Sequence, residues 1–137
     1  MPETRNARGL VDTSVVIALQ EIDPASLPVE VAVSAVTLAE LAAGPHATAD
    51  RAERARRQDR LQRTESTFEP LPVDAAVGRA YGRVYAAVTT AGSEACRRRA
   101  FDLLIAATAL AAELPLYTRN PNGFRELDSL VEVVPCH

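Results

Sequence analysis

The fold of this chain is organised around residues 100–109, which read AFDLLIAATA. The stretch is apolar and rich in alanine, which predicts a helix that packs closely against its neighbours. Asp102 places a carboxylate near the start of that helix, where apolar packing does not require a charge. The positive end of a helix dipole favours the ionised form, so we expect a low pKa for Asp102. A carboxylate of low pKa suits a metal ligand.

Two further acids occur in similar apolar surroundings. Asp12 ends the apolar run 9–11, and Glu40 lies within residues 34–41, SAVTLAEL. Open α/β sheets place their ligands at the carboxyl ends of the strands. We therefore expect an α/β fold to bring Asp12 and Glu40 alongside Asp102.

Both of these acids also have a purely structural interpretation. Asp12 or Thr13 would cap a helix that starts directly after the first strand. Glu40 would complete a capping box with Thr37 if its helix started at Thr37. If Ser34 is the cap instead, Glu40 lies in the second turn and is free to face a cleft.

Length and composition indicate an ordinary globular protein. The chain has 137 residues, 47% of them hydrophobic and 24% charged, which predicts one domain spanning residues 1–137. No apolar run is long enough to span a bilayer, and the first residues lack the apolar core of a signal peptide. We expect a cytoplasmic protein without membrane contact.

The residue types exclude several kinds of chemistry. All 15 basic residues are arginine, so a Walker-type phosphate loop and Schiff-base catalysis are excluded. Neither His46 nor His137 accompanies a Gly-x-Ser-x-Gly elbow, which disfavours a Ser-His-Asp hydrolase. Cys96 and Cys136 lack metal-ligand spacing and are expected to be free thiols. Carboxylates are therefore the side chains left that could carry out catalysis or bind a metal ion.

The arginines are unevenly distributed although the net charge is -3. They cluster at Arg51, Arg54, Arg56, Arg57, Arg60 and Arg63, and again at Arg97, Arg98 and Arg99. Such local patches can hold phosphates even on an acidic protein. The expected helix at residues 47–66 is either a solvated helix that packs one narrow stripe, or an outer arm that contacts RNA or a protein partner.

Strands and helices alternate along the chain. Strands are expected at residues 9–12, 29–34, 68–73, 114–118 and 131–134, and helices at 13–20, 34–43, 47–66, 74–90 and 96–113. Asp74 should cap the fourth helix, whose apolar face belongs to the core or to a dimer contact. The alternation predicts a parallel sheet covered on both faces.

The order of these motifs resembles the PIN-domain ribonucleases, and most of all the VapC toxins of bacterial type II toxin-antitoxin modules. The resemblance rests on LVDTS at 10–14, TLAEL at 37–41, DLLIAATA at 102–109, LYTRNP at 116–121, and Phe124. It covers nearly the whole chain, and the combination is far more specific than any one motif.

The resemblance implies a PIN-like α/β/α sandwich with a central parallel sheet of about four to five strands. It implies an endoribonuclease dependent on Mg²⁺ or Mn²⁺, with Asp12, Glu40 and Asp102 as catalytic residues and metal ligands. Converging carboxylates suit such hard cations. The family further implies a homodimer, inhibition by a VapB-type antitoxin, and a structured RNA substrate such as tRNA or rRNA whose cleavage inhibits translation.

Other residues would support this site. Thr13 and Ser14 hydroxyls could position a metal water or a phosphate oxygen, or cap the first helix. Family members often carry a fourth acid at the place of Asn120 or of Gly123. Here neither position has a carboxylate, and Asn120 offers a neutral oxygen.

Four arginines are candidates for contacts with RNA phosphates: Arg97, Arg98, Arg99 and Arg119. With three Phe, three Tyr and no Trp, the sequence does not indicate extensive base stacking, so recognition by shape and backbone is expected.

Two alternatives from other classes stay open. The missing fourth acid is compatible with a catalytically weak or inactive PIN-like domain that binds RNA or protein. A small α/β phosphatase or phospho-acceptor domain is disfavoured because lysine is absent and Ser14 stands where a second acid would be expected.

Overall fold

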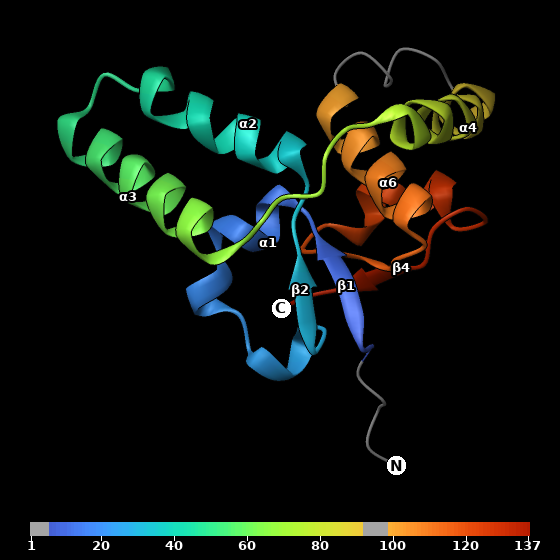
Figure 1. Ribbon diagram of the computed structural model, residues 1–137, viewed down its shortest axis with the longest axis horizontal. Helices are drawn as coiled ribbons and strands as arrows, with labels where there is room; N and C mark the ends of the chain where they lie inside the picture. The colour runs from blue at the N-terminus through green and yellow to red at the C-terminus, as the bar shows by residue number, and fades with distance from the viewer. Residues whose placement is uncertain (1–5, 92–98) are drawn as a thin grey trace.

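The computed structural model describes residues 6–91 and 99–137. Within this part of the chain, four strands form one parallel sheet in the order β2-β1-β3-β4 (Figure 1). The strands are β1 (Arg8–Val11), β2 (Glu30–Ala32), β3 (Leu116–Thr118) and β4 (Val133–Pro135). The predicted parallel sheet is confirmed, with β1 and β3 at its centre.

The helices are α1 (Thr13–Ile17), α2 (Ala35–Ala43), α3 (Arg51–Thr67), α4 (Ala75–Ala91) and α6 (Ala100–Ala112), with short 3-10 turns η1 (Leu19–Glu21), η2 (Pro24–Ser26), η3 (Gly44–Ala47) and η4 (Pro121–Leu127). They follow the predicted alternation with strands only in part, because in the described residues α2, α3, α4 and α6 follow one another between β2 and β3 without a strand. The helices α2 and α3 form a hairpin that extends away from the sheet (Figure 1). No helix in the described residues combines the length and the hydrophobicity needed to cross a membrane.

Two of the predicted helix caps are confirmed. The Val36 amide donates to Ser34 Oγ at 3.0 Å, so Ser34 caps α2. The Val77 amide donates to Asp74 Oδ1 at 3.1 Å at the start of α4. Each side chain satisfies a backbone donor that the first helical turn leaves without a partner.

The alternation of side chains along the strands produces a core on each face of the sheet. Leu10 and Leu116 point to the face covered by α4, α6 and η4. Val11 and Tyr117 point to the opposite face, where α1 packs. The apolar face of α4 belongs to the first core: Val77, Ala80, Val84 and Val88 are buried there. The alanines at 106, 107 and 109 are fully buried and allow α6 to pack closely.

The expected strand at residues 68–73 is wrong. Only Leu71 forms an isolated parallel bridge, with Ser34, beyond the end of β2. The Leu71 amide donates to Val33 O at 2.9 Å, and neighbouring Pro70 and Pro72 lack the amide hydrogens that a longer ladder requires.

Several element boundaries also differ from the prediction. The first helix ends at Ile17 and continues as the separate turn η1, and the arginine-rich helix starts at Arg51, capped by Asp50. The last strand starts at Val133 because the amide of Val131 still donates to Leu127 O after η4. The expected start of the 96–113 helix lies outside the described residues, within which α6 begins at Ala100.

Candidate active site

Asp12 follows the last residue of the central strand β1 and is only 4% exposed. Its Oδ1 accepts hydrogen bonds from the Val15 amide at 3.1 Å and from Ser14 Oγ at 2.6 Å. Asp12 is therefore the cap of α1, as the structural interpretation expected. The second carboxylate oxygen has no hydrogen-bond donor among the described residues, so capping leaves it available to a ligand.

Glu40 lies in the second turn of α2, because that helix is capped by Ser34. A capping box with Thr37 is thus excluded. Thr13 Oγ1 donates to Glu40 Oε1 at 2.6 Å and lies 3.0 Å from Thr37 Oγ1. Because the only Thr13 hydroxyl proton is used for Glu40, the Thr37 hydroxyl donates to Thr13. This chain of hydrogen bonds fixes α2, and with it Glu40, against α1.

Asp102 lies in the first turn of α6 and keeps much of its surface exposed. The expected low pKa is wrong, because the pKa of Asp102 is raised. Partial burial of the carboxylate is the main cause, the negative charge of Asp12 adds to it, and the charge of Arg99 opposes both. Loss of hydration and repulsion therefore outweigh the helix dipole.

The three acids influence one another although they are far apart in sequence. The pKa of Glu40 is raised, chiefly by burial, then by the charges of Asp102 and Asp12, while the Thr13 hydrogen bond opposes the shift. Such mutual repulsion marks negative charge that the protein leaves unneutralised. In residues 6–91 and 99–137, however, no three His, Cys, Asp or Glu side chains are close enough to hold a metal ion between them. The carboxylates share one region but do not form a closed cage.

Ser14 connects the ends of the two central strands. Its hydroxyl donates to Asp12 and accepts a hydrogen bond from the Arg119 amide at 3.3 Å, directly after β3. Asn120 is exposed, and its amide donates to Thr118 Oγ1 at 3.0 Å. Ser14 thus orients Asp12. A role of Asn120 in binding a ligand stays a prediction.

Arg99 is bound within the protein. Its guanidinium donates to the Gly123 carbonyl and pairs with Glu126 at 3.3 Å, which ties η4 to the start of α6. A phosphate contact by Arg99 or Arg119 stays a prediction. Arg97 and Arg98 lie outside the described residues.

Sequence reasoning missed two residues of this region. Thr37 was considered only as a capping residue, yet it is fully buried and supports Thr13. Glu126 has no signal in the sequence, because its partner Arg99 is 27 positions away. For Thr37, the motif TLAEL at 37–41 is the sequence signal that could have indicated a role near Glu40.

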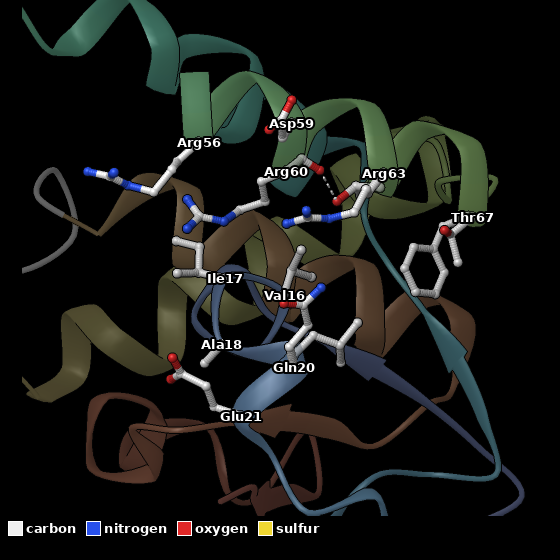
Figure 2. Close-up of a pocket in the computed structure, with 13 residues that line it drawn as sticks. Val16, Ile17, Ala18, Gln20, Glu21, Arg56, Asp59, Arg60, Arg63 and Thr67 are labelled. Atoms are coloured by element: carbon white, nitrogen blue, oxygen red, sulfur yellow. Dashed lines mark hydrogen bonds between the residues drawn. The ribbon is translucent and has the colours of Figure 1, made fainter. Parts of the chain in front are cut away.

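Two pockets lie between α1 and α3. The larger, of about 480 Å³, has residues of α1 and η1 on one side and arginines of α3 on the other (Figure 2). The smaller, of about 370 Å³, is lined by Thr13 and Glu40 together with Arg57 and Arg60 of α3. Glu40 therefore lies in the wall of a hollow whose opposite wall carries the Arg57–Glu53 ion pair and the guanidinium of Arg60.

Comparison with known proteins gives a consistent result. The family model for the PIN domain matches residues 9–130. Ribonuclease VapC5 of Mycobacterium tuberculosis is 38% identical over 133 residues, which are 95% of each chain. Ribonuclease VapC8 of the same organism is 40% identical over 112 residues, 80% of this chain and 96% of that one.

Solved structures agree with the sequence relatives. A chain of VapBC-5, a member of the VapBC family of toxin-antitoxin systems from Mycobacterium tuberculosis, matches with a TM-score of 0.82 and 37% identity, over 94% of this chain and 98% of that chain. FitAcB from Neisseria gonorrhoeae matches with a TM-score of 0.68 and 28% identity, over 91% and 95% of the two chains. The similarity therefore extends over nearly the whole chain.

Proposed function

Because the chain belongs to the PIN-domain family and, within it, to the VapC ribonucleases, we propose that it is a metal-dependent endoribonuclease with Asp12, Glu40 and Asp102 as its catalytic acids. It hydrolyses phosphodiester bonds of RNA and acts as the toxin of a type II toxin-antitoxin module. The site assignment is supported by the placing of three acids that are remote in sequence so close together at the carboxyl end of the sheet that their charges add to the burial that raises the pKa of Glu40 and of Asp102.

The donor set fits Mg²⁺ or Mn²⁺. Magnesium is bound in proteins by one or two carboxylates together with substrate phosphates and waters, so it does not require a cage of three side chains. Asp12 has one oxygen without a protein donor, and within the described residues no donor bonds the carboxylate of Asp102. Asp12 and Asp102 would hold the cation, with the carboxylate of Glu40 on the same side of the sheet.

The side chains of this site have separate tasks. When bound, a divalent cation neutralises charge on the scissile phosphate and lowers the pKa of a water molecule. Ser14 and the Val15 amide hold the Asp12 carboxylate in one orientation. Glu40, whose raised pKa makes it a stronger base than an ordinary carboxylate, accepts the proton of the attacking water. Thr13 keeps Glu40 in place for this transfer.

The test is cleavage of total bacterial RNA by the purified protein with Mg²⁺, with Mn²⁺ or with chelator. We expect new RNA ends that require metal and that decrease roughly 100-fold or more in Asp12→Asn and Asp102→Asn, the scale of losing one electrostatic group in an active site. Asp128→Asn is the matched control, because Asp128 is exposed and lies outside the site. Full activity in chelator would contradict the proposal.

A second candidate function is a catalytically weak or inactive domain that binds RNA or protein. The absence of a carboxylate at Asn120 and Gly123 favours it, since a second metal ion would bind weakly. Retention of RNA without metal-dependent cleavage would support this candidate against the first.

Partners follow from the relatives. VapBC-5 is described as a toxin-antitoxin system, and we propose a VapB-type antitoxin as the partner of this chain. We also propose a homodimer that acts on RNA in the cytoplasm. Co-purification from the native host tests the antitoxin, and sedimentation of the purified protein tests the dimer. A protein that sediments as a monomer at all concentrations would contradict the latter.

A further inference from the structure

The arginines of α3 fall into two groups. One group is bound within the protein: Arg54 Nε donates to the Pro45 carbonyl at 3.1 Å, and Arg56 and Arg57 both pair with Glu53. The bonds from Arg54 and Arg57 to the carbonyls of Pro45 and Gly44 hold α3 against the turn η3, and Glu53 offsets part of the positive charge of the helix. Arg54, Arg56 and Arg57 therefore have a structural role.

Arg60 and Arg63 belong to the other group. In the described residues, neither guanidinium forms an ion pair or a hydrogen bond with the protein. Figure 2 shows the Arg60 side chain reaching from α3 toward α1, above Ile17, with Arg63 beside it. Arg60 is partly buried in this position. A guanidinium that has lost part of its hydration without gaining a counter-charge is stabilised by an anionic ligand.

The position of Arg60 connects it to the acids. Arg60 and Ile17 line both the 480 Å³ pocket and the 370 Å³ pocket that contains Thr13 and Glu40. The two hollows therefore adjoin at Arg60. Yet Arg60 forms no ion pair with Glu40 and is not among the charges that shift its pKa. The positive charge of Arg60 therefore lies near the three acids but does not neutralise them.

We propose that Arg60 binds an RNA phosphate that flanks the scissile position, and that the groove between α1 and α3 guides the RNA backbone to the acids. The proposal rests on the ribonuclease function proposed above. The planar guanidinium matches the geometry of a phosphate group, and Arg63 continues the basic wall of the larger pocket away from Glu40.

RNA fits this groove better than an acidic protein segment does. A backbone that follows Arg63 and Arg60 leads into the pocket of Glu40, where a phosphate has to be placed for hydrolysis. An acidic segment on the same path would bring further carboxylates toward Asp12, Glu40 and Asp102, and the charges of Asp102 and Asp12 already add to the burial that raises the pKa of Glu40.

Arg60→Gln tests the proposal, with Arg51→Gln as the matched control. Arg51 is on the same helix, is exposed, has no partner for its guanidinium in the described residues and lines neither pocket. Binding of fluorescein-labelled bulk bacterial tRNA is measured by anisotropy in chelator, at salt concentrations of about 50 to 200 mM. We expect Arg60→Gln to weaken binding roughly tenfold and to reduce the salt slope by about one, and Arg51→Gln to change neither.

Cleavage kinetics add a second readout. Arg60→Gln should raise KM roughly tenfold and leave kcat near the wild-type value, because the flanking phosphate is bound equally in ground and transition states. Arg60→Lys keeps the positive charge but loses the planar guanidinium that can bind a phosphate with two parallel hydrogen bonds. It should therefore retain the wild-type salt slope and bind tRNA with an affinity between those of the wild type and Arg60→Gln. If Arg60→Gln fails to fold, Arg60→Lys tests the proposal through its predicted loss of affinity.

The outcomes separate this inference from the proposed function. If the wild type neither binds nor cuts RNA, the proposed function fails. If the wild type cuts RNA but Arg60→Gln equals Arg51→Gln, the assignment of Arg60 is wrong. If Arg60→Gln weakens binding of poly-glutamate while tRNA binding is unchanged, the groove serves an acidic protein partner and the proposal is overturned.

Discussion

Thr13 joins helix α1 to helix α2 through two hydrogen bonds, one with Glu40 and one with Thr37. The hydroxyl forms no hydrogen bond with Asp12, its neighbour in sequence, whose Oδ1 accepts from Ser14 and from the Val15 amide instead. Two adjacent hydroxyl residues thus position two different acids. If the acids form the site as proposed, Thr13 and Ser14 support it by positioning Glu40 and Asp12.

Thr13→Val removes both hydrogen bonds while keeping the side-chain shape. We expect a loss of about 1–3 kcal/mol in unfolding free energy, because the buried Thr37 hydroxyl loses its partner. The pKa of Glu40 should rise further, since the hydrogen bond from Thr13 lowers it. Urea unfolding measures the first effect, and the acid limb of the pH profile of cleavage, displaced to higher pH, measures the second.

Thr13→Ser is the control for that substitution, because it keeps the hydroxyl and should retain both properties. If Thr13→Val unfolds like the wild type and shows an unchanged pH profile, the hydrogen bonds of Thr13 do not position Glu40.

The raised pKa values of Glu40 and Asp102 predict how stability depends on pH. The folded protein binds protons more tightly at both groups than the unfolded chain does. In metal-free buffer, their contribution to the unfolding free energy is largest below the ordinary carboxyl pKa values, roughly 4, and decreases as the pH rises through the raised values. In Asp102→Asn, the unfolding free energy should fall less as the pH rises, and at neutral pH it should equal or exceed that of the wild type. Urea unfolding in chelator across pH measures it.

Asp128→Asn is the control, because it removes an exposed carboxylate outside the site and should keep the wild-type pH dependence. A loss of several kcal/mol in Asp102→Asn, as for an acid within a structural network, would contradict the assignment of Asp102 to the site.

At the scale of elements, helix α6 combines a close-packed body with a strained end. Glu113 ends the helix in the left-handed conformation, with φ 56°, and the Leu114 amide then donates back to Ala109 O at 2.9 Å. Glycine is the usual residue at such a position, because a side chain with a Cβ is unfavourable there. Helix α6 therefore carries Asp102 at one end and a correctable strain at the other.

Glu113→Gly should raise the unfolding free energy by up to about 1 kcal/mol, because relief of the left-handed strain exceeds the entropy that glycine loses on folding. Ala112→Gly, one residue earlier within the helix, should instead lower it by about 0.5–1 kcal/mol. Thermal and urea unfolding check both. Equal destabilisation by the two substitutions would show that the conformation of Glu113 is not strained.

At the scale of the whole molecule, the sheet topology brings the candidate site residues to one edge of the sheet. The strands β1 and β3 are neighbours in the sheet although they are more than 100 residues apart, so Asp12 and the turn at Asn120 meet at the same edge. Helix α6 brings Asp102 to this edge and Arg99 ties it to η4. Neither Asn120 nor Gly123, the two places where the family resemblance leads us to expect a fourth acid, carries a carboxylate.

Gly123→Asp should strengthen binding of Mn²⁺ roughly tenfold, the size of effect that groups supporting a metal site commonly have. A Cβ at Gly123 would lie 3.1 Å from Asn120 Nδ2, so only the end of an exposed side chain has to move. Thermal melts against Mn²⁺ concentration measure the change as a larger metal-induced stabilisation. Gly123→Asn adds the same volume without charge and should behave like the wild type. An equal gain in both variants would contradict a role for the added charge.

The sequence by itself determined the approximate positions of β1, β2, β3 and β4 and of the main helices, the caps at Ser34 and Asp74, and which acids are candidates for the site. These features depend on local rules, such as hydrophobic periodicity and the capping of free amides. The expected strand at 68–73 was wrong because hydrophobic pattern alone does not show whether a longer ladder would need the amide hydrogens that Pro70 and Pro72 lack.

Only the tertiary structure decided how Thr37, Thr13 and Glu40 are hydrogen-bonded, why the pKa of Asp102 is raised, and that Arg60 has no counter-charge in the described residues. Each of these depends on distances between elements remote in sequence and on how much water the packing removes. Hydration and the charges of neighbouring elements act through space, and the order of residues along a chain does not specify them.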